Sequence, residues 1–127
     1  MNSINVVIVN PKFIAAFMGT PLICCWLVAE ALAVGVGSST DVALMFGGAL
    51  TLIIGEFLET LVCHIPKNDA LAAHKGGNDA EVWAKYYASW TAWNHVRMVA
   101  SLATVVQFAL ALFYRGARLG AGYGGLP

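Results

Sequence analysis

Charged residues are scarce in this sequence. Only 11% of its 127 residues are Asp, Glu, Lys or Arg, whereas a soluble domain carries about 25%. So little charge cannot cover the surface of a water-soluble globule of this size. Seven acidic residues balance seven basic ones, and without an excess of positive charge a nucleic acid is not an expected partner. The hydrophobic share of 59% excludes a disordered chain and indicates an integral membrane protein.

Cysteines and recognisable cofactor motifs are also few. Cys24, Cys25 and Cys63 lack the spacing of a zinc site, so we interpret them as buried thiols. The sequence contains no phosphate loop, dinucleotide fingerprint or serine nucleophile motif. It also contains no HExxH motif and no paired Glu-x-x-His segments. We therefore predict no metal and no cofactor, and we interpret the histidines as capping, interfacial or acid–base groups.

Three apolar stretches are long enough to cross a bilayer core of about 30 Å, which takes roughly 20 helical residues. They cover residues 13–35, 41–62 and 90–114. We predict an all-α transmembrane bundle in one domain over 1–115, with a loop over 64–78 and a flexible, Gly-rich tail over 116–127. The third helix starts near Asp79, so at about 54 Å it extends out of the membrane or tilts steeply.

The basic residues outside the spans are distributed unevenly between the two sides. Four lysines fall on one side and two arginines on the other: Lys12, Lys67, Lys75 and Lys85 against Arg115 and Arg118. The positive-inside rule then places the N-terminus and the 64–85 loop in the cytoplasm. The expected location is the cell (inner) membrane, with membrane lipid as the surrounding partner.

The second span combines small residues with carboxylates. Small residues at a four-residue spacing predict a helix contact face, and they are Ala43, Gly47, Thr51 and Gly55. Glu56 and Glu59 continue on this side of the helix near one end of the bundle. An ionisable residue at membrane depth indicates a functional site. The alternative is an interfacial position, where both are solvated or bonded to Arg97 or a helix end.

The third helix carries one continuous polar and aromatic face. Its members recur at three- and four-residue steps: Trp83, Tyr87, Trp90, Asn94, Arg97, Ser101, Thr104 and Phe108. Two interpretations remain open. The tryptophans form an interfacial belt while the hydroxyls bond across helices, or the whole face lines a pocket. The concentration of Trp90, Trp93, Asn94, His95 and Arg97 within eight residues favours the pocket.

Several of these residues also form a family pattern. The loop HIPKNDAL, Trp83 and the run WTAWNHVR resemble the anthrone oxygenase-like family of small integral membrane proteins, largely known as a domain of unknown function. That family shows N-V-P-x-N-x-x-L in the loop and W-x-x-x-N-x-x-R before the last span. The matching positions are Pro66, Asn68, Leu71, Trp83, Trp90, Asn94 and Arg97, with Asn5, Asn10, Pro11, Phe13, Gly19 and Thr20 near the start.

The sequence departs from the family pattern in two ways. Family members usually have four spans, and the first is missing here because Met1 falls where the family is already leaving that helix. A late start site, a shortened member or a wall supplied by another subunit would each account for this. The asparagine that opens the loop motif is replaced by His64, which can act as a base near neutral pH whereas asparagine cannot.

The resemblance implies a cofactor-independent oxygenase that converts an anthrone to an anthraquinone with dioxygen. The implied binding residues for a flat, apolar aromatic substrate are Asn68, Trp83, Tyr87, Trp90 and Trp93. Arg97 and Asn94 would hold the enolate oxygen, and His64 or Glu56 would remove the proton. The alternative is a non-catalytic membrane protein, a homo-oligomer or an accessory subunit of a membrane complex, that packs through the small-residue face of the second span.

Overall fold

The described part of the chain is entirely helical. The computed structural model describes residues 11–74, 76–77 and 79–123, so Asn5 and Asn10 of the family pattern lie outside it. The elements are α2 (Pro11–Val34), α3 (Thr40–Leu52), the π-helical turns η1 (Ile53–Leu58) and η2 (Thr60–His64), α4 (Ile65–Ala73) and α5 (Asp79–Tyr123). Among these residues there is no strand, which confirms the predicted all-α class.

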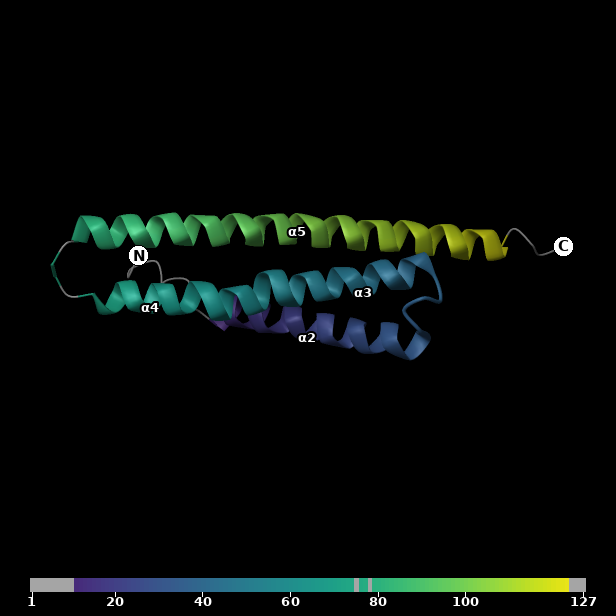
Figure 1. The fold of residues 1–127 in the computed structure, drawn as a ribbon. Coiled ribbons are helices and arrows are strands. Elements are labelled where there is room, and N and C mark those ends of the chain that lie inside the picture. Colours follow the sequence, from purple (N-terminus) through teal and green to yellow (C-terminus); the bar gives the residue numbers. More distant parts are fainter. Residues whose placement is uncertain (1–10, 75, 78, 124–127) are drawn as a thin grey trace.

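The elements form three long rods that lie side by side (Figure 1). The central rod runs without a break from α3 through both π-helical turns into α4. It contacts α2 on one side and α5 on the other. Three helical segments are long and apolar enough to cross a membrane, namely Pro11–Val34, Thr40–Ala73 and Ala80–Gly122. The predicted three-span transmembrane bundle is therefore confirmed.

Large apolar side chains point away from the bundle. Leu22, Leu112 and Phe113 are each about 70% exposed, and no large side chain in the described ranges is fully buried. In water an apolar surface this extensive would drive aggregation, whereas in a bilayer it faces lipid tails. The environment of the helices is therefore membrane lipid.

Small residues hold the central rod against α5. A Cβ added at Gly48 would lie 3.1 Å from the ring of Phe108, and one added at Gly55 would collide with the Cβ of Ala100. Thr51 Oγ1 lies 3.2 Å from Gln107 Oε1 on α5. In lipid such close approach supplies the attraction that hydrophobicity supplies in water. The predicted contact face is confirmed at Gly47, Thr51 and Gly55, which contact α5 of the same chain.

The second rod extends further than predicted. Residues 64–78 were expected to be a loop with at most one short helical turn, but α4 continues the rod through Ala73. Pro66 does not end the rod; it lies in the first turn of α4, directly after the π-helical turn η2. The rod ends at His74, whose ψ is 119°, and Gly76 follows with a φ of 77°.

The last helix is also longer than predicted. It has 45 residues instead of about 36 and includes Gly116–Tyr123, most of the expected flexible tail, while 124–127 lie outside the described residues. At about 68 Å it is more than twice as long as a bilayer core is thick. Arg118 links this extension to the start of α3, since its Nη2 donates to Asp41 Oδ2 at 2.8 Å.

Replacing Gly55 with alanine should separate the central rod from α5. The new Cβ would collide with Ala100, and overpacking of this kind costs about 1–3 kcal/mol. We expect a lower thermal unfolding midpoint in detergent for Gly55→Ala. The matched control is Gly19→Ala on α2, where a Cβ meets nothing within 4 Å. Equal midpoints for the two variants would contradict the described packing.

Replacing Arg118 with alanine should loosen the end of α5 alone. The bond to the buried carboxylate of Asp41 is lost, so the last two turns should open more often. We expect faster amide hydrogen exchange over 115–122 and unchanged exchange in α2. Lys85→Ala, which removes only the exposed pair with Glu81, serves as the control. Unaltered exchange in Arg118→Ala would show that the ion pair does not hold the extension.

Candidate functional site

The central feature of the candidate site is a buried pair of ionisable side chains. His64 Nδ1 and Glu59 Oε1 lie 2.8 Å apart, and the two side chains are only 5% and 4% exposed. In an α-helix, residues five apart point about 140° away from each other, because each residue turns by about 100°. The π-helical turn over Thr60–His64 uses i to i+5 hydrogen bonds and brings such residues to the same side. The pair therefore exists because the helix widens here.

The pair leaves several polar atoms unsatisfied. The 2.8 Å contact lacks the alignment of a good hydrogen bond, and neither Glu59 Oε2 nor His64 Nε2 has a hydrogen-bond partner among the described residues. Buried polar atoms in native proteins almost always have a hydrogen-bond partner. Leaving such an atom without a hydrogen bond costs about 1–3 kcal/mol of stability. These atoms are thus placed to take up a proton or a ligand group.

Trp90 and Arg97 of α5 lie near this pair, and Asn94 is bonded to Arg97. The Trp90 ring lies edge-on to His64, with the ring centroids 5.5 Å apart. The positive charge of Arg97 acts on His64 electrostatically. Arg97 Nη2 donates to Asn94 Oδ1 at 2.7 Å. Of the predicted site residues, the structure therefore places Trp90 against His64 and pairs Asn94 with Arg97 on the same helix.

The remaining predicted binding residues form a second group around α4. Tyr86 donates its hydroxyl to Asn68 Oδ1 at 2.7 Å. The Trp83 ring stacks on Tyr86 and Tyr87 at centroid distances of 5.6 and 6.3 Å. Trp83 and Tyr87 are about half exposed, so this group forms an open aromatic surface next to the buried pair. The rings offer flat faces without enclosing a ligand.

Trp93 is held by a cation. Lys67 of α4 places its Nζ 5.4 Å from the centre of the Trp93 ring, within the range of a cation–π interaction. The contact ties α4 to α5 beside the aromatic surface. The Trp93 ring therefore has a structural role in holding the two helices together.

Glu56 lies apart from the pair. It lines a cavity of about 260 Å³ between α2 and η1, together with Thr20, Pro21 and Phe57. Glu59, which the sequence analysis did not select as a catalytic residue, is the carboxylate that meets His64. A five-residue spacing gives no signal in an α-helix, so only a prediction of the π-helical turn would have distinguished the two glutamates.

The histidines and carboxylates do not gather into a metal centre in the described part of the chain. No three His, Cys, Asp or Glu side chains there lie close enough together to hold one ion. His74 and His95 are exposed. The arrangement around His64 has instead the components of acid–base chemistry beside an aromatic surface.

These features define a membrane-embedded helical bundle with a buried imidazole–carboxylate pair under an aromatic, Asn- and Arg-bearing helix. The chain belongs to the anthrone oxygenase family, whose sequence profile matches residues 12–107. The match includes all the residues of the candidate site and ends before the C-terminal extension of α5. No curated protein and no solved structure shows significant similarity to the chain.

Substituting one member of the His64–Glu59 pair should lower the stability of the protein more than substituting both members. His64→Leu leaves the Glu59 carboxylate buried without a partner, and breaking a buried pair costs about 3–5 kcal/mol. The double variant with Glu59→Leu removes both polar groups and should recover much of this loss. Thermal unfolding in detergent of the two single variants and the double variant measures the coupling. Strictly additive losses would show that the two side chains do not interact.

Proposed function

We propose that this protein is a cofactor-independent oxygenase that oxidises a flat aromatic substrate of the anthrone type with dioxygen. The observation that carries the proposal is the buried His64–Glu59 pair beneath Trp90, with Arg97 and Asn94 on the same helix. Membership of the anthrone oxygenase family supports the reaction class, although a shared family alone does not fix an activity.

His64 is the proposed base. It takes a proton from the activated methylene carbon of the substrate, and the adjacent Glu59 carboxylate stabilises the imidazolium that results. The electron pair of the broken C–H bond moves into the ring system and forms an aromatic enolate. Glu59 therefore acts as a positioning residue, because it contacts the base and not the substrate.

Arg97 and Asn94 are the proposed donors to the enolate oxygen. Their hydrogen bond to each other fixes both side chains before the substrate arrives, as preorganised donors require. The enolate passes an electron to dioxygen, and the two radicals combine to a peroxide anion at the former methylene carbon, which takes the proton back from His64 and becomes a hydroperoxide. Loss of water leaves the new carbonyl, so one anthrone and one dioxygen give one anthraquinone and one water.

The aromatic surface of Trp83, Tyr87 and Trp93 is the proposed entry for the substrate. Large flat faces bind a polycyclic molecule by stacking, and these side chains are partly exposed in the first half of α5. Asn68, held by Tyr86, offers a polar contact at the edge. An apolar substrate and dioxygen both concentrate in lipid, which suits a site reached from the membrane.

The alternative role as a non-catalytic subunit lacks its expected contact face. Gly47, Thr51 and Gly55 were expected to pack against another chain, but they face α5 instead. Self-association remains compatible with the oxygenase and would have to use another surface. The proposal therefore centres on catalysis.

Oxygen uptake by the purified protein tests the proposal. With an anthrone and without added flavin or metal, uptake should exceed the uncatalysed rate. His64→Gln, which cannot take up the proton, and Arg97→Ala should each reduce uptake at least tenfold. Lys85→Ala on the exposed side of α5 should leave it unchanged. Uptake at the background rate in the unaltered protein would overturn the proposed function.

A further inference from the structure

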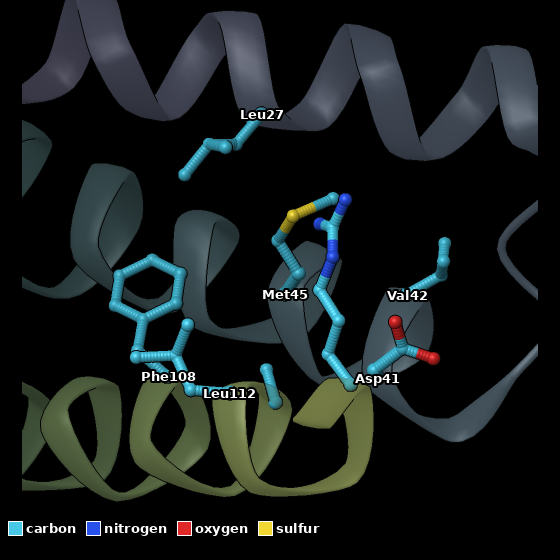
Figure 2. Close-up of a pocket in the computed structure, with 8 residues that line it drawn as sticks. Leu27, Asp41, Val42, Met45, Phe108 and Leu112 are labelled. Carbon is cyan, nitrogen blue, oxygen red and sulfur yellow. The ribbon is translucent and has the colours of Figure 1, made fainter. Parts of the chain in front are cut away.

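Two adjoining cavities lie between the three rods, at the end where α2 turns into α3, and Figure 2 shows the first of them. Their volumes are about 290 and 340 Å³. Five residues line both, so they form one continuous site: Leu27, Asp41, Val42, Met45 and Arg115. None of the residues assigned to the proposed oxygenase site lines either cavity.

One part of this site is apolar. Leu27 on α2 and Phe108 on α5 point from opposite rods into the same space, with Met45 of the central rod beside them (Figure 2). Ala111 and Leu112 complete this wall. The lining suits a hydrocarbon chain, because it offers contact area and no hydrogen-bonding groups.

The other part is charged, and it contains two charges of each sign. Asp41 and Arg118 are paired at 2.8 Å, with a further contact from Arg118 to Ser39. Glu30 and Arg115 also line the second cavity, whose charged part we call the mouth of the site. Arg115 interacts with Asp41 only at longer range, and neither Glu30 nor Arg115 makes a hydrogen bond or ion pair with another described residue. One anion and one cation are thus left for a ligand.

The mouth lies where the spans end. The first spanning segment ends at Val34 and the second begins at Thr40, so Glu30 and Asp41 lie close to this boundary on either side of the turn. The exposed indole of Trp26 lines the same mouth, as is typical of a side chain near the headgroup layer. The charged part therefore meets lipid headgroups, while the apolar part runs toward the bilayer centre.

We propose that this site binds one zwitterionic phospholipid of the phosphoethanolamine type. The phosphate pairs with Arg115, the ammonium pairs with Glu30, and an acyl chain lies along Leu27, Met45 and Phe108. A purely anionic headgroup would face the unpaired carboxylate of Glu30, and a headgroup without phosphate would leave Arg115 unmatched. The four charged side chains sum to zero, which matches a headgroup without net charge.

Native mass spectrometry of the detergent-solubilised full chain tests the assignment. The probes are phosphatidylethanolamine, phosphatidylglycerol and diacylglycerol with identical acyl chains. We expect a one-lipid adduct with phosphatidylethanolamine at least fivefold more abundant than with either other lipid. Equal or stronger retention of phosphatidylglycerol, or no retained lipid, would overturn the proposal.

Substitutions distinguish the two proposed contacts. Glu30→Gln should shift the preference toward phosphatidylglycerol, a gain that misfolding cannot produce. Arg115→Gln should reduce binding of both phospholipids at least fivefold. Ala111→Phe fills the apolar part and should reduce all binding, while Lys85→Gln should change nothing. An unchanged preference in Glu30→Gln would overturn the assigned orientation. Oxygen uptake is not used as a readout, so the result is independent of the proposed oxygenase activity.

Discussion

The close contact between small residues of the central rod and α5 fixes the register of these two rods, on which the candidate site depends. Gly48 and Gly55 let the two backbones approach until side chains on α5 touch them. In a bilayer this packing replaces the hydrophobic effect as the source of association. Because α5 is fixed along the rod in this register, Trp90 lies beside His64 and Arg118 reaches Asp41.

The widened helix in the central rod is the second determinant. A regular α-helix would point Glu59 and His64 in different directions, and each would then meet lipid or need another partner. The π-helical geometry over η1 and η2 instead buries both together. Widened turns of this kind are frequent at functional sites, and here the turn places a potentially charged pair inside a chain with few charges.

Most of the fold can be predicted from the sequence, but only part of the candidate site can. Hydropathy predicts the three spans because apolar length is a local property, and the three- and four-residue spacing on α5 places Trp90, Asn94 and Arg97 together for the same reason. Three features were not predicted. Glu59, not Glu56, is the carboxylate that contacts His64. The helix also continues past Pro66 in α4 and beyond Gly116 in α5. Each of these features depends on a contact with a residue distant in sequence or on a change of helix type. The spacing of residues along the chain predicts neither.

The continuity of α5 has a geometric consequence for the two ends of the molecule. Arg97 and Arg115 are 18 residues apart on one unbroken helix, which is about five full turns and about 27 Å along the axis. The two guanidinium groups therefore leave the helix in nearly the same direction, one toward the buried histidine and the other toward the headgroup layer. A rotation of α5 about its axis would turn both guanidinium groups through the same angle. The orientations of the two ends of the molecule are therefore coupled through this helix.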